Sequence, residues 1–133
     1  MLGVETVPKE RTGSYGIVAL KSGGEEMQVD SIVEKPDPAD APSDMGVVGR
    51  YVLTPKIFEL LESTGRGAGG EIQLTDAIAA LLAHEPVFAY RFAGVRYDCG
   101  NKLGYLQATV AYGLAHPDTG ARFRAHLNDV LSK

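Results

Sequence analysis

The chain has 133 residues, the length of one ordinary domain and enough to bury a core. Its residues are 44% hydrophobic and 23% charged, which excludes a disordered chain, and its apolar runs are too short for a transmembrane helix. The formal net charge of −4 argues against a nucleic-acid partner, because phosphate neutralisation needs clustered Lys and Arg.

Two features bear on the compartment. Residues 1–5 lack the basic start of a signal peptide. Cys99 is the only cysteine, so neither an internal disulfide nor a cysteine-based zinc site can form. We therefore expect a cytoplasmic protein with no membrane segment.

The first half of the chain has the pattern of paired strands. Residues 15–20 (YGIVAL) and 27–33 (MQVDSIV) are apolar or alternating, and the turn-forming residues 22–24 between them are typical of a β-hairpin. Residues 36–45 (PDPADAPSDM) are too polar and too rich in proline for regular structure, and we expect a surface loop. A strand is predicted again at residues 46–54.

Helices and a further strand follow. Pro55 opens a predicted helix over residues 56–64, and residues 72–85 predict a second helix. The second helix has one apolar face, made of Leu74, Ile78, Leu81 and Leu82. Residues 87–94 (VFAYRFAG) alternate as a strand does and lead towards Asp98.

The C-terminal segment is predicted to be helical from Lys102 onward, in two pieces divided by residues 116–118 (HPD). Asp118 can lie at the N-terminal end of the second, amphipathic piece. Its apolar side chains suit a subunit interface and an intramolecular core equally well. The predicted fold class is α/β, with a mixed sheet, flanking helices and a helical C-terminal segment.

Glu34, Lys35 and Pro36 stand where a predicted strand runs into a loop, a position from which side chains reach ligands in open α/β sheets. There a carboxylate can accept hydrogen bonds from sugar hydroxyls, and an ammonium can meet a phosphate. Pro36 biases Lys35 towards an extended backbone, so the two charged side chains point to opposite sides unless the chain bends. A solvated charge pair is the plainer interpretation of this tripeptide alone.

Glycines precede the second predicted helix. Gly65, Gly67 and Gly70 have the spacing G-x-G-x-x-G, but they follow a helix rather than a strand, which excludes a dinucleotide site. The segment is either a plain connector or a loop that closes over a ligand. No Gly-Lys-Ser/Thr follows, so a P-loop is excluded as well.

Polar residues flank the start of that helix. Glu71 and Asp76 can interact favourably with the helix dipole, and Thr75 is suited to capping or a turn. The three histidines lie far apart without an obvious Asp or Ser partner, which excludes a nucleophilic triad.

Asp98 lies between a tyrosine and a Cys-Gly turn, directly before a helix-forming run. It can be a metal ligand, a helix-entry residue or the polar tip of a loop. One carboxylate can bind Mg²⁺, which keeps several waters and takes its other oxygens from a second carboxylate and from substrate phosphates. Cys99 is most simply a small, half-buried residue.

Five segments together resemble the bacterial UTP–glucose-1-phosphate uridylyltransferases: ERTGSYGIV, VDSIVEKP, MGVVGRYVLTP, GAGGEIQLTDAI and YRFAGVRYDCGNKLGYLQATV. Glu-Lys-Pro is shared by many sugar-nucleotide pyrophosphorylases, whereas GEIQLTDA and YDCGNKLGY together are specific to this type. The resemblance implies that residues 1–133 are the C-terminal, sugar-phosphate-binding half of a Rossmann-like nucleotidyltransferase domain. It also implies that the glycine-rich nucleotide loop belongs to the other half.

The resemblance implies roles for individual residues. Glu34 is similar to the carboxylate that accepts from the glucose hydroxyls, and Lys35 to the catalytic cation that meets the sugar phosphate. Gly16 and Val47 are similar to positions that approach the sugar closely, largely through backbone groups. Asp98 is similar to one of two aspartates that hold the catalytic Mg²⁺.

The implied function is transfer of a uridylyl group from UTP to glucose 1-phosphate, giving UDP-glucose and pyrophosphate. The partners implied are these substrates and products, with Mg²⁺ as cofactor. With half a site, the chain is expected to be inactive alone. Two alternatives are a non-catalytic sugar-nucleotide-binding module and an oligomerisation module, in which residues 102–133 form the subunit contact of a homo-oligomer.

Overall fold

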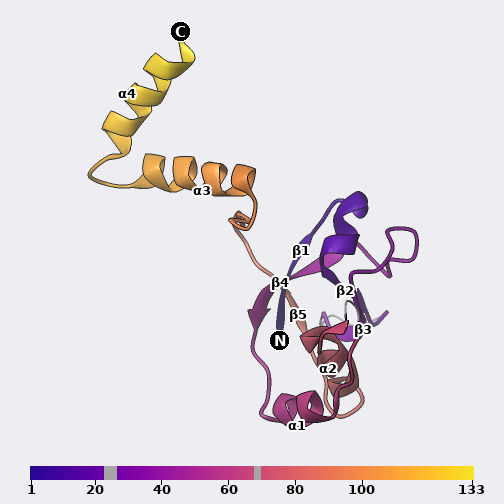
Figure 1. Ribbon diagram of the computed structural model, residues 1–133. Coiled ribbons are helices and arrows are strands. Elements are labelled where there is room, and N and C mark those ends of the chain that lie inside the picture. The colour runs from indigo at the N-terminus through magenta and orange to yellow at the C-terminus, as the bar shows by residue number, and fades with distance from the viewer. Residues whose placement is uncertain (23–26, 68–69) are drawn as a thin grey trace. The chain divides into compact units, whose positions relative to one another are not determined.

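A computed structural model describes residues 1–22, 27–67 and 70–133. Within them the chain divides into two compact units, Met1–Phe92 and Ala93–Lys133. The first unit contains the sheet with two α-helices, and the second contains a pair of helices (Figure 1).

The first unit is built on one mixed sheet of five strands in the order β3-β2-β4-β1-β5. The strands are β1 (Leu2–Thr6), β2 (Gly16–Leu20), β3 (Val29–Glu34), β4 (Met45–Tyr51) and β5 (Ala89–Arg91). The pairs β2–β3, β2–β4 and β1–β4 are antiparallel, whereas β1 and β5 are parallel. The prediction of an α/β fold with a mixed sheet is confirmed.

Strands β2 and β3 form the predicted antiparallel pair, with Gly16 opposite Glu34. In the turn predicted between them, Gly23 and Gly24 lie outside the described residues. The loop predicted after β3 is confirmed, because residues 35–44 contain no helix or strand. These elements place the Glu-Lys-Pro tripeptide at the end of a paired strand.

Strand β1 was not predicted from the sequence, although it lies between β4 and β5. Leu2 and Val4 are fully buried in the core. The partners of β1 are residues 45–51 and 89–91, which lie far along the chain. The sequence near β1 therefore contains no hairpin pattern that would predict this strand. The short 3₁₀ helix η1 (Lys9–Ser14), which connects β1 to β2, was also not predicted.

Strand β4 is irregular near Gly49. Leu2 pairs with Tyr51 but Val4 pairs with Val47, so β4 carries extra residues between these two pairs. Gly49 has a φ of 73°, a left-handed conformation that glycine adopts without a steric penalty. The irregularity follows the residues that pair with β2, and the pairing of β4 with β1 resumes at Tyr51.

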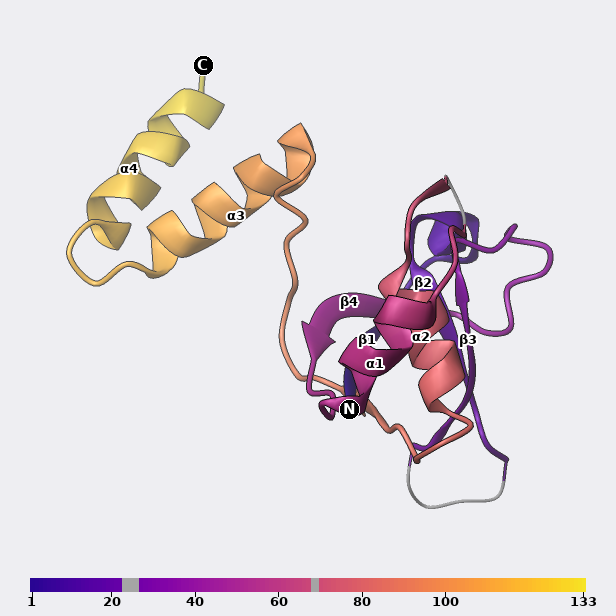
Figure 2. The same ribbon diagram turned by 60° about the horizontal axis from the view of Figure 1, so that its bottom comes forward.

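Two helices cover the sheet of the first unit (Figure 2). Helix α1 (Lys56–Ser63) packs against α2 (Leu74–Leu81), and α2 packs against β3. The predicted apolar face of α2 is confirmed, since Ile78 and Leu81 are almost fully buried in the core. The core consists of Leu2, Val4, Val18, Val29, Ile32, Met45, Val47, Ile57, Ala77, Ile78, Leu81, Val87 and Ala89.

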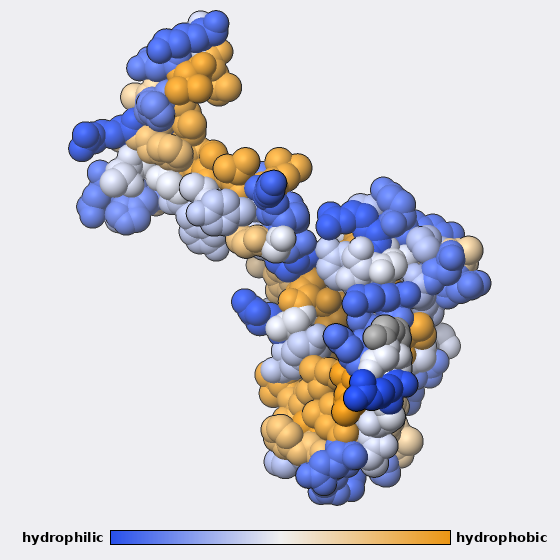
Figure 3. Space-filling model, in the orientation of Figure 1, coloured by the Kyte–Doolittle hydropathy of each residue, from blue (hydrophilic) through white to orange (hydrophobic). Residues whose placement is uncertain are grey.

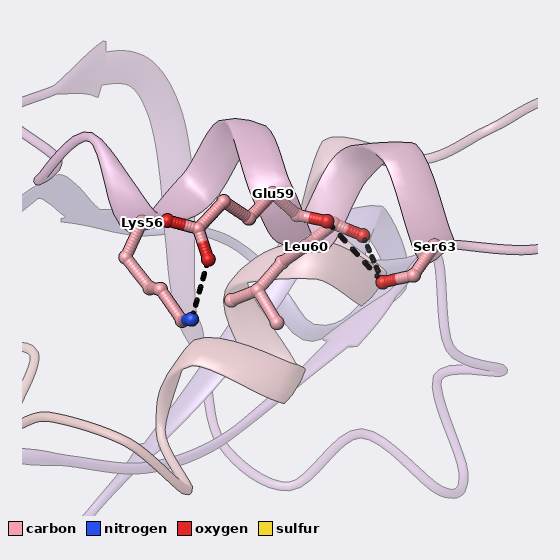
Figure 4. A network of polar contacts seen from close by, with 4 residues as sticks. All are labelled: Lys56, Glu59, Leu60 and Ser63. Carbon is pink, nitrogen blue, oxygen red and sulfur yellow. Dashed lines mark hydrogen bonds and ion pairs between the residues drawn. The ribbon is translucent and has the colours of Figure 1, made fainter.

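Helix α1 has polar contacts along its exposed side (Figure 4). The Lys56 ammonium donates to Glu59 Oε2 at 2.6 Å, and this hydrogen bond, followed by the lysine charge, lowers the pKa of Glu59. At the other end, the Ser63 hydroxyl donates to the carbonyl of Leu60 at 2.9 Å. These contacts support α1 outside the core.

The second unit is a helical hairpin of α3 (Lys102–Ala115) and α4 (Gly120–Leu131), which confirms the two helical pieces predicted there. A Cβ at Gly113 would lie 2.8 Å from the ring of Phe123, so the absence of a side chain at Gly113 lets the two helices approach. Thr119 is the N-cap residue of α4, and Asp118 lies one residue before it.

Hydrophobic side chains remain on the surface of the helical hairpin (Figure 3). Leu106 is 59% exposed on α3, and Leu131 is 83% exposed at the end of α4. No helix formed by the described residues is long and apolar enough to cross a membrane.

Candidate functional site

Glu34 and Lys35 come together where β3 ends. Lys35 has a φ of 45°, and no other non-glycine residue in the described ranges has a positive φ. The expected extended backbone at Lys35 is therefore wrong. Its N–H donates to the Tyr15 carbonyl at 2.9 Å, which holds the bend against β2. Because of this bend, Lys35 Nζ lies 3.7 Å from Glu34 Oε1 instead of pointing to the opposite side.

Thr75 joins this pair from the first turn of α2. Its hydroxyl donates to Glu34 Oε2 at 2.6 Å, a length typical of hydrogen bonds to ionised carboxylates. The expectation that Thr75 caps the helix is wrong, because the N-cap residue is Gln73. Thr75 is 9% exposed and the Glu34 side chain is 15% exposed, so the two groups meet largely away from water.

Gly16 lies on β2 opposite Glu34, and Val47 lies on β4, on the other side of β2. A Cβ at Gly16 would lie 3.2 Å from both Glu34 Oε2 and Thr75 Oγ1, so a side chain there would crowd the carboxylate. The β2–β4 register places Val47 next to Gly16 on the neighbouring strand. Val47 is 7% exposed, which leaves little of its side chain for a ligand. The structure thus brings Gly16, Glu34, Lys35 and Val47 into one region of the first unit.

The pKa of Tyr51, at the end of β4, is also affected by the Glu34 carboxylate. Burial raises the pKa of the Tyr51 hydroxyl above its usual value of 10.0, and the negative charge of Glu34 raises it further. Tyr51 is 41% exposed, so its phenol is still accessible. Sequence reasoning did not single out Tyr51, because it read as one more aromatic residue of a strand.

Asp98 belongs to the second unit, and its carboxylate accepts hydrogen bonds from the residues just before α3. The Gly100 N–H donates to its Oδ1 at 3.0 Å, and the Asn101 side-chain amide donates to its Oδ2 at 3.1 Å. Asn101 in turn caps α3 by accepting from the Gly104 N–H at 2.8 Å. A Cβ at Gly104 would overlap the Asp98 carbonyl, so glycine is required there. Of the three interpretations of Asp98, the geometry supports a role at helix entry.

The same carboxylate also fits one ligand of a magnesium site. A carboxylate has about four lone-pair positions, so one that accepts hydrogen bonds can also bind a metal ion. Mg²⁺ typically uses one or two carboxylates together with waters and substrate phosphates. The described residues contain no group of three or more His, Cys, Asp or Glu able to hold a metal ion. A magnesium ion at Asp98 would therefore need further oxygens from outside the described residues.

Two backbone hydrogen bonds connect described residues of the glycine-containing segment before α2. The Gly70 N–H donates to the Gly67 carbonyl and the Gly67 N–H donates to the Glu71 carbonyl, both at 2.9 Å. Residues 68–69 of this segment lie outside the described residues, so a connector and a ligand-closing loop stay open as alternatives. The expectation of a half-buried Cys99 is wrong, because this residue is exposed.

The sheet and these motifs are those of a nucleotidyltransferase. The sequence profile described as Nucleotidyl transferase matches residues 2–113, and the chain belongs to this family.

Within the family, the chain is similar to enzymes named UTP–glucose-1-phosphate uridylyltransferase. It is 48% identical over 118 residues to the one from Streptococcus pneumoniae, which covers 87% of this chain and 40% of the relative. It is 45% identical over 131 residues to the one from Haemophilus influenzae, which covers 96% and 44%. The resemblance indicated by the motifs is confirmed, and the chain spans less than half the length of these relatives.

Solved structures with a similar fold are also UDP-glucose pyrophosphorylases. A UDP-glucose pyrophosphorylase from Acinetobacter baumannii matches with a TM-score of 0.81 and 45% identity, over 97% of this chain and 45% of that one. A UDP-glucose pyrophosphorylase complexed with UDP-glucose matches with a TM-score of 0.78 and 42% identity, over 84% and 43%. These matches confirm the fold class.

Proposed function

We propose that this chain forms the sugar-phosphate side of a UTP–glucose-1-phosphate uridylyltransferase. The observation that carries the proposal is the pair of Glu34 and Lys35, a carboxylate and an ammonium 3.7 Å apart at the end of β3. Support comes from the names of the relatives and from one solved relative complexed with UDP-glucose and another bound to UTP. The activity of the whole protein is part of the proposal, because the chain spans less than half of these relatives.

The four candidate site residues of the first unit each have a proposed part in binding the sugar phosphate. The Glu34 carboxylate accepts hydrogen bonds from sugar hydroxyls. A sugar without the matching hydroxyl leaves a desolvated acceptor unpaired and binds less well. The Lys35 side chain is 55% exposed, so its ammonium can reach the phosphate. Gly16 and Val47 let the sugar approach the backbone of β2 and β4.

In the proposed reaction, a phosphate oxygen of glucose 1-phosphate attacks the α-phosphorus of UTP in line. The bond from that phosphorus to the bridging oxygen of the β-phosphate breaks, and pyrophosphate leaves. The Lys35 ammonium offsets negative charge on the crowded phosphates, and the chain forms no covalent intermediate. Asp98 is proposed to hold Mg²⁺, which would supply further charge neutralisation when bound. Because one such carboxylate is half of the expected pair, we propose that the chain alone does not turn over.

The test is pyrophosphate release by a chimera in which this chain replaces the matching part of the Haemophilus influenzae relative, 45% identical over 131 residues. We expect release that requires UTP, glucose 1-phosphate and Mg²⁺. Glu34→Ala, Lys35→Ala and Asp98→Asn should each reduce it by about 100-fold, the scale of losing one positioned charged group. Glu59→Ala changes an exposed carboxylate on α1 and should leave the rate unchanged.

Two outcomes contradict the proposal. Full activity of the Glu34→Ala and Lys35→Ala chimeras would show that this pair does not serve the reaction. An inactive chimera that still binds UDP-glucose would favour the non-catalytic sugar-nucleotide-binding module.

We also propose that the helical hairpin contributes to a homo-oligomer, because Leu106 and Leu131 expose 59% and 83% of their surface to solvent. Sedimentation velocity should show a mass that falls on dilution, and Leu106→Glu should shift the chain towards monomer. A monomer at every concentration would contradict this.

The exposed thiol of Cys99 fits a reducing compartment, and we propose a cytoplasmic location.

A further inference from the structure

The Thr75 hydroxyl donates to a distant carboxylate rather than to its own helix. Two other threonines bond locally: Thr64 donates to the Leu60 carbonyl at 2.7 Å, and Thr109 donates to the Tyr105 carbonyl at 2.8 Å. These contacts one turn back are the common outcome for a helical threonine. Thr75 instead donates to Glu34, 41 residues away in sequence, at 2.6 Å.

We propose that Thr75 is a positioning residue that fixes the Glu34 carboxylate for recognition of the sugar hydroxyls. This inference rests on the proposed function. Thr75 sits on α2, whose apolar face is anchored in the core, so its hydroxyl is a rigid donor. A glutamate side chain has three rotatable bonds, and ordering it only when a ligand binds would reduce affinity.

The carboxylate is held from several directions. Thr75 donates to Oε2, Lys35 Nζ lies 3.7 Å from Oε1, and the missing Cβ of Gly16 leaves the space that Oε2 occupies. The Thr75 hydrogen bond uses one lone pair of Oε2, so the carboxylate keeps acceptor capacity for hydroxyls of a ligand. Thr75 therefore acts through Glu34 and need not touch the sugar.

A purely structural role for Thr75 makes a different prediction. If Thr75 only fills space in the core, valine, which has the same shape, should replace it without loss of binding. If the hydroxyl positions Glu34, serine should replace it and valine should not. The chain offers a matched control in Thr54, whose hydroxyl donates to Glu85 Oε1 at 2.7 Å in an exposed pair near the opposite end of α2.

The experiment is calorimetric titration of the 133-residue chain with UDP-glucose and with its epimer UDP-galactose. We expect Thr75→Val to weaken UDP-glucose binding by about tenfold and to reduce the preference over UDP-galactose, the scale of losing a hydrogen bond to a charged group. Thr75→Ser should stay within about threefold of the wild type, as should Thr54→Val. In a Glu34→Gln background, Thr75→Val should have little further effect, because the two changes act through one contact.

The outcomes separate this inference from the function on which it rests. Wild-type affinity in Glu34→Gln, or no binding by the wild type, would overturn the proposed function and this inference with it. Weakened binding in Glu34→Gln but not in Thr75→Val would overturn the inference alone. So would a Thr75→Val effect that adds in full to that of Glu34→Gln. If Thr75→Val does not fold, Gly16→Ala crowds the same hydrogen bond without changing either partner, and unchanged selectivity in that variant would equally overturn the inference.

Discussion

Replacing Lys35 with glycine should separate folding from ligand binding. A non-glycine residue in the left-handed region costs about 1–2 kcal/mol, and Lys35 has a φ of 45°. Glycine removes that strain but loses about 0.5–1 kcal/mol through the greater entropy of the unfolded chain. Loss of the 3.7 Å ion pair with Glu34, whose lysine side chain is 55% exposed, costs at most about 0.5 kcal/mol. We therefore expect Lys35→Gly to change the free energy of unfolding by between about −0.5 and +1.5 kcal/mol, while sugar-phosphate binding weakens.

The assay is urea unfolding, with the midpoints compared at a common slope. The control is Lys56→Gly at the start of α1, where no positive φ is relieved and the 2.6 Å contact with Glu59 is lost. That variant should lose about 1 kcal/mol. If Lys35→Gly destabilised the chain as much as Lys56→Gly does, the bend at Lys35 would not be strained, and this reasoning would be refuted.

Three further outcomes follow from the contacts described above. Ile78→Ala should lower the free energy of unfolding by about 2–5 kcal/mol because Ile78 is fully buried, whereas Phe58→Ala, 68% exposed on α1, should cost far less in the same urea titration. Asn101→Ala should remove the cap of α3 and raise hydrogen exchange in its first turn about fivefold, for a loss of about 1 kcal/mol; unchanged exchange would contradict the cap. A residue-resolved NMR titration of the Tyr51 ring should give a midpoint above 10.0, shifted down by Glu34→Gln; the associated stability is present below pH 10.0 and lost as the pH rises through the folded pKa.

Local patterns in the sequence predicted much of this fold. The two strands of the β2–β3 pair are predicted by alternating or apolar residues beside turn-forming residues. The apolar face of α2 appears as leucines and an isoleucine at helical spacing, and Ile78 and Leu81 do lie in the core. The loop after Glu34 follows from its prolines. In each case the signal lies within a few residues of the element that it predicts.

What could not be predicted depends on contacts distant in sequence. Strand β1 pairs with residues 45–51 and 89–91, which no pattern near Leu2 reveals. The bend at Lys35 runs against its preference before proline because Tyr15 holds its N–H. Thr75 looked like a capping residue, and its partner Glu34 became visible only once α2 was packed against β3. The site was therefore recognisable as a motif before the hydrogen bond that supports it could be seen.

The central claim is that Glu34 and Lys35 bind a sugar phosphate, and an amide chemical-shift titration of the chain with glucose 1-phosphate tests it most directly. We predict saturable shifts concentrated at Gly16, Lys35 and Val47, which disappear in Glu34→Ala while the spectrum of the folded chain is preserved. Saturable shifts elsewhere that persist in Glu34→Ala, or no shifts at all, would contradict it.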